Sequence, residues 1–254
     1  MIEILTDEEL QKMIKAGDLM KIVIRELKKA VKPGVSTLEL DLLAQKIIKE
    51  NGGSAPCIGY GEPPFPAAIC TSVNEVVVHG IPSADEILKE GDIVTTDVVV
   101  EIDGFMADCA RTFPVGQISE EKQLLIDRTK ECFFKGLEKA VEGNRIGDVS
   151  AAVQQHAESF GYGVVRELTG HGIGREMHQD PEVPNYGKAG RGARIKKGMA
   201  FCIEPMITRG QRYVVLGYDG WRVQTADGSP AAHYENTVII TDKGPVMTTF
   251  EEEN

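Results

Sequence analysis

Hydrophobic residues recur with the period of an amphipathic helix in two pairs of segments. In the first pair, Thr6 with Glu9 and Ser36 with Glu39 have the spacing of capping boxes and mark two helix starts. The pattern after them predicts helices to about residue 31 and about residue 50, and glycines follow both. In the second pair, the pattern predicts one helix from about residue 119 and another after residue 143.

The two pairs of helices are similar in sequence. The first helix of one pair ends in LKKAVKPG, and that of the other ends in LEKAVEG. In each copy a shorter helix and then β-rich sequence follow, and no Pro- or Ser-rich linker separates the copies. We therefore expect a single α+β domain, residues 1–254, made of two pseudo-symmetric αα-β halves, roughly 6–116 and 117–254.

Between the helix pairs, the sequence DIVTTDVVVEIDGFMADCARTF predicts a β-hairpin closed by Asp103 and Gly104. If these two residues form the loop, Val99 pairs with Asp108. Residues two apart on a strand share a face, so Asp97 lies on the side of Val99 and diagonal to Asp108. The pattern therefore predicts two carboxylates within roughly 7–8 Å of each other on one apolar face.

Further acids and imidazoles interrupt apolar segments in the second half. His171 lies between two glycines, which let the backbone approach another group closely, and His178 follows it. Glu204 lies in the apolar segment GMAFCIEPMI, and Glu235 precedes the apolar segment NTVIIT. A buried ionised carboxylate is very costly unless it is paired or bound to a metal. The four acids therefore need compensating positive charge if they are buried.

Two sources of that charge are compatible with the sequence. Arg111, Lys196 or Lys197 could form salt bridges, although the two lysines lie in a segment with the composition of an exposed loop. Alternatively, two divalent cations would balance four negative charges, held about 3.5–4 Å apart around a shared hydroxide. An oxygen-rich ligand set with one imidazole suits Mn²⁺, Fe²⁺, Co²⁺ or Zn²⁺.

Composition and charge exclude several classes of protein. The formal charge is −11 and the pI is near 5.0, which argues against a nucleic-acid binder, DNA included. The acidic N-terminal segment lacks the features of a signal peptide, and no apolar segment approaches the ~18 residues of a membrane span. The five cysteines include no C-x-x-C pair, which is typical of a reduced protein. We therefore expect a cytoplasmic protein.

Five segments carry a family resemblance. They are NEVVVHGIP around His79, the hairpin sequence around Asp97 and Asp108, GHGIGREMHQDPEVPNYG around His171 and His178, GMAFCIEPM around Glu204, and DGWRVQTADGSPAAHYENTVIIT around Trp221 and Glu235. Together they resemble the bacterial type I methionine aminopeptidases of peptidase family M24, over essentially the whole chain. The resemblance implies the pita-bread fold, in which two related halves surround a central antiparallel sheet and hold a metal site between them.

The resemblance implies removal of the initiator methionine from nascent proteins and peptides whose second residue is small. It also implies a monomer with two divalent ions per chain, of Co, Mn, Fe, Zn or Ni. Glu204 would act as the base toward the bridging water, and His178 would hydrogen-bond the scissile carbonyl. His79 would contact the scissile amide nitrogen or the backbone of the second residue and assist proton delivery. The implied metal ligands are Asp97, Asp108, His171, Glu204 and Glu235.

Selectivity for methionine would need an apolar pocket that tolerates sulfur. By position in the family, its lining would be Cys57, Tyr60, Phe65, Cys70, Met177 and Trp221. Three residues depart from the commonest family pattern: Met177 replaces Phe, Cys202 replaces Thr, and Asn236 replaces His. Because Cys202 and Asn236 lie near ligand positions in the sequence, we expect them to influence metal affinity.

Other functions are compatible with the same fold. Proline-directed aminopeptidases and prolidases share the fold and the ligand set, but they usually carry an additional N-terminal domain and lack this combination of motifs. Some pita-bread relatives only bind RNA or proteins and have typically lost metal ligands, whereas all five positions are kept here. The basic residues between Lys188 and Lys197 are a candidate for a transient ribosome contact, although the strong negative net charge favours a solvated loop.

Overall fold

Both predicted pairs of helices are present in the computed structural model, which describes residues 1–251. Thr6 and Ser36 are the N-caps of the first two helices, and both capping boxes form. The helix predictions are confirmed to within about two residues, the usual uncertainty of a helix end. The helices are α1 (Asp7–Ala30), α2 (Thr37–Glu50), α3 (Glu120–Leu137) and α4 (Ile146–Ser159).

Within the described residues, the strands form four antiparallel sheets. The first has the order β1 (Ile69–Val73), β3 (Ile93–Ile102), β4 (Phe105–Pro114). The largest has the order β14 (Gly244–Met247), β13 (Asn236–Thr241), β8 (Ala200–Ile203), β6 (Gly170–Gly172), β7 (Gln179–Val183). The two smaller sheets have the orders β10 (Val214–Leu216), β11 (Val223–Thr225), β2 (Val76–Val78) and β12 (Ala231–His233), β9 (Met206–Thr208), β5 (Gly163–Val164).

The predicted hairpin is confirmed in its register. Strands β3 and β4 pair antiparallel, with Val99 opposite Asp108. Asp103 and Gly104 both have positive φ, 53° and 77°, as a two-residue turn that matches the twist of the strands requires. Asp97 therefore lies on the same face as Val99, diagonal to Asp108.

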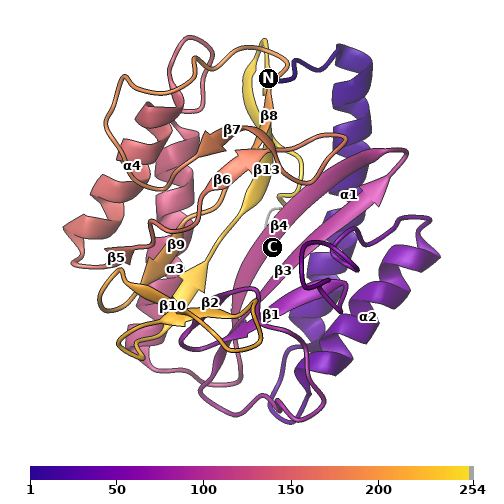
Figure 1. The fold of residues 1–254 in the computed structure, drawn as a ribbon, viewed down its shortest axis with the longest axis vertical. Helices are drawn as coiled ribbons and strands as arrows, with labels where there is room; N and C mark the ends of the chain where they lie inside the picture. Colours follow the sequence, from indigo (N-terminus) through magenta and orange to yellow (C-terminus); the bar gives the residue numbers. More distant parts are fainter. Residues whose placement is uncertain (252–254) are drawn as a thin grey trace.

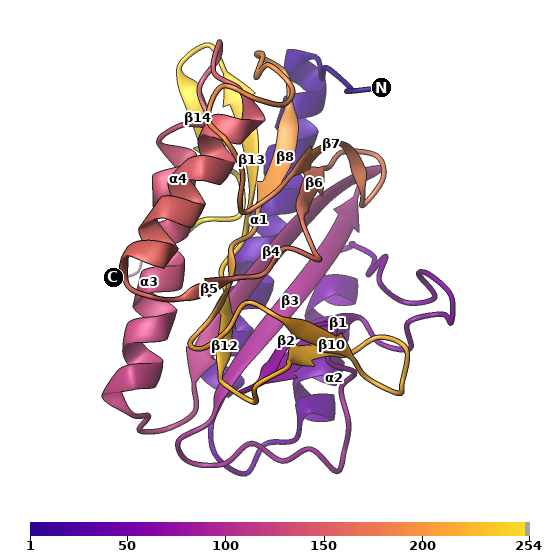
Figure 2. The same cartoon turned by 60° about the vertical axis from the view of Figure 1, so that its left-hand side comes forward.

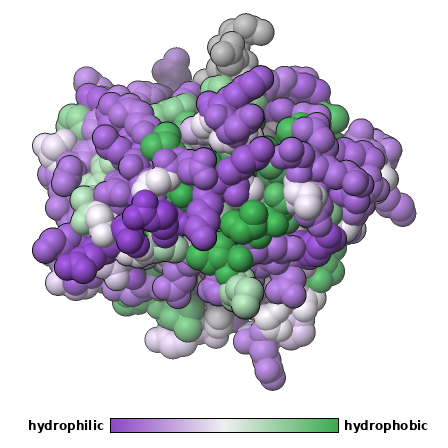
Figure 3. All heavy atoms as spheres, turned by 90° about the horizontal axis from the view of Figure 1, so that it is seen from above, coloured by the Kyte–Doolittle hydropathy of each residue, from purple (hydrophilic) through white to green (hydrophobic). Residues whose placement is uncertain are grey.

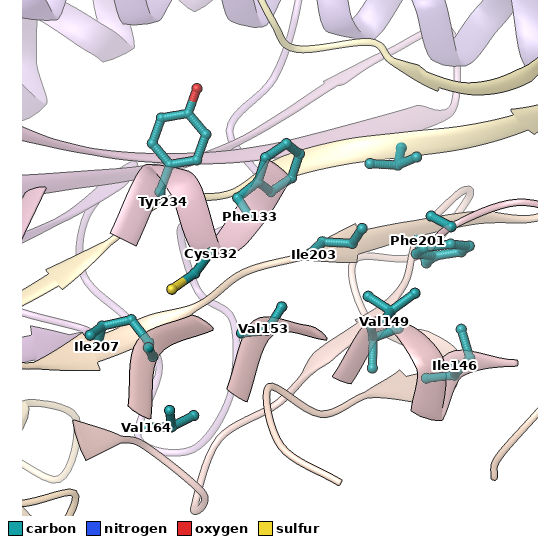
Figure 4. Close-up of a cluster of buried hydrophobic side chains, with 14 of the residues drawn as sticks. Cys132, Phe133, Ile146, Val149, Val153, Val164, Phe201, Ile203, Ile207 and Tyr234 are labelled. Carbon is teal, nitrogen blue, oxygen red and sulfur yellow. The ribbon is translucent and has the colours of Figure 1, made fainter. Parts of the chain in front are cut away.

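The helices cover the strands from two sides (Figures 1 and 2). Helices α1 and α2 lie behind β1, β3 and β4, and their apolar faces form one buried cluster with these strands. Helices α3 and α4 lie on the other side of the molecule and pack on β8 and β9. Figure 4 shows this second cluster, in which Phe133 and Val153 face strand residues such as Ile203. The α+β prediction is confirmed, and the division of the chain near residue 116 stays a prediction.

The two helix-covered parts meet where β4 runs beside the segment that leads into β13. The main-chain N–H of Glu235 donates to Ala110 O at 3.0 Å. The N–H of Asp108 donates to Thr237 Oγ1 at 2.8 Å, and that hydroxyl donates in turn to Asp108 O at 3.0 Å. These bonds bring two predicted acids side by side, Asp108 of β4 and Glu235 in the link between β12 and β13.

The surface agrees with the acidic, polar composition. Seen from above (Figure 3), most of it is hydrophilic, and a group of hydrophobic side chains is exposed near the centre of the view. Within residues 1–251, no helix combines the length and the apolar composition that crossing a bilayer requires.

Asp41 links α2 by hydrogen bonds to the start of β1, the strand that carries Cys70. Its buried carboxylate accepts hydrogen bonds from the N–H groups of Ala68 (2.8 Å) and Ile69 (3.1 Å). Because Asp41→Ala leaves two buried donors unpaired, we expect it to lower the free energy of unfolding by about 2–4 kcal/mol. The control Asp18→Ala, at an exposed site of α1, should change it by less than about 0.5 kcal/mol. Urea unfolding measures both, and equal effects would contradict the prediction.

Candidate active site

A cavity of about 290 Å³ is bordered by segments from both parts of the molecule. All side chains that the sequence analysis assigned to the site border it, and their individual roles stay predictions. They are Cys57, Tyr60, Phe65, Cys70, His79, Asp97, Asp108, His171, Met177, His178, Glu204, Trp221 and Glu235. The cavity also borders side chains that the sequence analysis did not assign to the site: Val78, Val99, Leu168, Thr169, Met206 and His233.

Four of the predicted metal ligands, Asp108, His171, Glu204 and Glu235, lie close together. His171 Nε2 lies 3.6 Å from Asp108 Oδ2 and 3.4 Å from Glu204 Oε1. Atoms of Asp108, His171, Glu235 and Cys202 that could bind a metal all lie within 4.8 Å of one another. The hairpin thus supplies Asp108 and, beside it, Asp97, whereas the other members come from the second half of the chain.

The acids of this cluster oppose one another's ionisation. Burial, and then the charges of Asp108 and Glu204, raise the pKa values of Asp97 and Glu235 well above their usual range. Burial raises the pKa of Glu204 to about 8, while His171 opposes this rise and Asp108 adds to it. Among the described residues, one oxygen each of Asp108, Glu204 and Glu235 is buried without a hydrogen-bond partner. Such orphaned oxygens fit a site for divalent cations.

The cationic side chains considered from the sequence are engaged elsewhere. Arg111 donates to the main-chain oxygen of Glu235 and, at 2.6 Å, to Asn236 Oδ1. Lys196 and Lys197 are exposed, as the loop-like composition predicts. These contacts favour metal ions over salt bridges as the compensating charge.

Two glycines allow His171 to reach the acids. A Cβ on Gly172 would lie 2.1 Å from Asp180 O, and one on Gly170 would lie 2.5 Å from Cys202 O. No other residue type could replace either glycine without moving the neighbouring backbone, so the predicted close approach is confirmed. Strand β6 can therefore lie tightly between β7 and β8 and present His171 to the cluster.

The apolar wall of the cavity lies next to the acids. Cys57, Phe65, Cys70 and Met177 are buried in one cluster, and Trp221 packs against it. The rings of Phe65 and Trp221 meet edge to face, with centroids 5.2 Å apart. Burial raises the pKa of both Cys57 and Cys70, so their thiols are neutral and can contact a thioether as apolar, polarisable groups.

Tyr60 determines the state of His178. Tyr60 Oη lies 2.5 Å from His178 Nδ1, and the His178 ring lies edge-on to that of His171, with centroids 4.3 Å apart. Because a phenol normally donates its proton to a neutral imidazole, we assign the ring proton of His178 to Nε2. That nitrogen is then a hydrogen-bond donor available to a substrate.

Cys202 and Asn236, which depart from the commonest family pattern, contact groups that hold the backbone of the predicted ligands. Cys202 Sγ lies 3.8 Å from Thr237 Oγ1, the hydroxyl that bonds both main-chain groups of Asp108. Asn236 Oδ1 accepts hydrogen bonds from Arg111 at 2.6 Å and from Thr249 at 3.0 Å. Both side chains therefore support the segments that carry the predicted ligands.

His233 is the imidazole that the sequence analysis missed. It is buried and borders the cavity, and its Nε2 lies 3.7 Å from a carboxylate oxygen of Glu235. Its signal in the sequence was the spacing of two residues from Glu235, which often places side chains on one face of an extended segment.

A buried cluster of acids with one imidazole, beside an apolar pocket, is the donor set of a metal-dependent hydrolase. Comparisons with known proteins agree with this class. The profile of Metallopeptidase family M24 matches residues 11–242. The chain is 52% identical over 250 residues to methionine aminopeptidase of Clostridium acetobutylicum, covering 98% of this chain and 99% of that protein. The crystal structure of methionine aminopeptidase from Rickettsia prowazekii superposes with a TM-score of 0.96 at 40% identity, covering 98% of this chain and 100% of that one.

The chain therefore belongs to metallopeptidase family M24. Within that family it has the pita-bread fold and the activity of a methionine aminopeptidase, so it uses divalent metal and acts on peptides with N-terminal methionine. Prolidase from Pyrococcus furiosus shares the fold alone, with a TM-score of 0.80 at 22% identity, over 98% of this chain and 66% of that one. These findings confirm the predicted family and fold, and they confirm the methionine aminopeptidase activity over the proline-directed and non-catalytic alternatives.

The raised pKa of Glu204 makes the metal-free protein sensitive to pH. The folded state holds this proton more tightly than the unfolded chain, so stability falls as pH rises from 4.5 to about 8. We expect Glu204→Gln to reduce this fall and to stabilise the metal-free protein at pH 8 by on the order of 1 kcal/mol or more. The exposed Glu50→Gln is the control. Thermal unfolding after chelation measures both, and a Glu204→Gln protein no more stable than wild type at pH 8 would refute this.

Proposed function

We propose that the chain removes N-terminal methionine with two divalent ions held by Asp97, Asp108, His171, Glu204 and Glu235. The observation that carries this proposal is the convergence of buried carboxylate oxygens that have no hydrogen-bond partner among the described residues. Four carboxylates carry the charge that two divalent ions neutralise. Oxygen donors with one imidazole fit Mn²⁺, Fe²⁺, Co²⁺, Zn²⁺ or Ni²⁺, and the identity of the ion then depends on cellular supply.

Bound divalent ions supply Lewis acidity, which acidifies water and polarises a carbonyl group. Glu204, an acid of the cavity with a buried oxygen that has no hydrogen-bond partner among the described residues, would take a proton from the attacking water and return it to the leaving amine. His178 donates from Nε2 to the substrate carbonyl oxygen, where negative charge develops. His79 borders the same cavity and contacts the scissile nitrogen.

The rest of the cavity accounts for substrate choice. The bound ions would also offer a coordination position to a free α-amine, which an internal residue of a peptide lacks. The neighbouring apolar wall, with Cys57, Cys70 and Met177, accepts an unbranched thioether side chain. A methionine bound this way places its carbonyl group between the acids and His178. The resemblance to bacterial type I methionine aminopeptidases implies a small second residue.

Peptide hydrolysis tests this function directly. After chelation, we expect Mn²⁺, Fe²⁺ or Co²⁺ added under anaerobic conditions to restore release of methionine from Met-Ala-Ser. Met-Lys-Ser and Ala-Pro-Ser should remain intact, because the first has a large second residue and the second lacks methionine. Amino-acid analysis of the products measures all three. Preferential cleavage of Ala-Pro-Ser, or no cleavage by folded protein with any of these ions, would overturn the proposal.

Tyr60→Phe tests the role of His178. Without the phenol, the imidazole of His178 loses the partner that holds its proton on Nε2. We expect kcat for Met-Ala-Ser to fall about 10-fold, with little change in KM or in metal content, because ring orientation and tautomer matter for a proton donor. The control Tyr213→Phe, at an exposed tyrosine, should match wild type. An unchanged kcat in Tyr60→Phe would contradict the role of Tyr60 in holding the proton of His178 on Nε2.

A further inference from the structure

Four of the five histidines in the sequence border the cavity, and the proposed mechanism uses only three of them. The fourth is His233, at the end of β12. The fifth, His156, lies on α4 and contacts Glu131 of α3. A buried imidazole beside the proposed metal ligands and without an assigned role needs an explanation.

The backbone of His233 is held firmly. In the sheet, His233 pairs with Met206 of β9. Its N–H donates to Thr112 Oγ1 at 2.9 Å, and that hydroxyl donates back to His233 O at 3.0 Å. The hydroxyl oxygens of Thr112 and Thr95 lie 2.7 Å apart. The ring therefore projects into the cavity from a fixed main-chain position.

The ring itself lacks partners. His233 is only 2% exposed, and neither ring nitrogen has a hydrogen-bond partner among the described residues. A buried nitrogen without a partner costs about 1–3 kcal/mol, and native proteins rarely keep such a group without a use for it. The nearest acid is Glu235, whose Oε2 lies 3.7 Å from His233 Nε2 and whose Oε1 is also unpartnered. This separation is only slightly longer than a hydrogen bond, so the two groups are neighbours that can pair.

We propose that His233 is a positioning residue that donates a hydrogen bond from Nε2 to the carboxylate of Glu235 and orients it for metal binding. The proposal rests on the proposed function, in which Glu235 is a ligand. A donor behind a ligating carboxylate fixes its rotamer and limits the ways in which its oxygens can face the ions. Arg111 already holds the main-chain oxygen of Glu235, so His233 completes the restraint by acting on the side chain.

Three substitutions separate the two ring nitrogens. In His233→Gln the amide nitrogen reaches about as far as Nε2, and in His233→Asn it reaches about as far as Nδ1. His233→Leu fills the space without a donor. The control is His156→Gln, which changes the histidine outside the cavity.

The test is the affinity of each metal-free variant for Co²⁺, measured by titration calorimetry and by the visible absorption of the bound ion. We expect His233→Leu and His233→Asn to weaken at least one binding step by 10–100-fold, with an altered spectrum. His233→Gln should stay within about 3-fold of wild type, as should His156→Gln. Circular dichroism of the metal-free proteins verifies folding.

The outcomes distinguish this proposal from the one on which it rests. Wild-type affinity in a folded His233→Leu protein would overturn the role of His233, with the metal site intact. Equal rescue by Asn and Gln would overturn the assignment to Nε2. Failure of wild-type protein itself to bind Co²⁺ would instead overturn the proposed function. If His233→Leu fails to fold, the comparison of Gln with Asn still decides.

Discussion

Mutual repulsion among buried carboxylates dominates the energetics of the site at the centre of this protein. Asp97, Asp108, Glu204 and Glu235 lie where burial and one another's charges raise the pKa values of three of them. Chemically, such a cluster is unfavourable for a folded protein on its own, because each ionised oxygen loses water without gaining a protein donor. The carboxylate cluster lowers the stability of the metal-free fold, and bound cations would neutralise it. Functional sites commonly lower stability in this way.

The surrounding structure keeps this unfavourable cluster together. Asp108 is held through both of its main-chain groups by Thr237, and Glu235 is held through its own by Ala110 and Arg111. Because these bonds use the backbone, the carboxylates remain free for other ligands. The helices contribute indirectly: each pair packs on the far side of the strands that carry the acids, so the cluster lies between two rigid layers.

Features set by short-range interactions could be predicted from the sequence. The capping boxes at Thr6 and Ser36, each a motif of four residues, define two helix starts. The Asp103-Gly104 turn fixes the register of the hairpin, which places Asp97 and Asp108 on one face. The pocket residues followed from family resemblance. The role of His233 could not be predicted, because its isolation depends on which polar groups the packing of β12 and β9 leaves out of reach. The support that Asn236 gives depends likewise on Arg111, a contact between residues 125 positions apart in the sequence.

The most direct test of the account is a crystal structure of the protein with Mn²⁺, located by anomalous scattering. Two Mn²⁺ ions in the cavity, bound by oxygens of the four acids and a nitrogen of His171, are the predicted result. A protein that hydrolyses Met-Ala-Ser with its ions bound elsewhere, or with these carboxylates unliganded, would contradict the claim that cations complete this cluster.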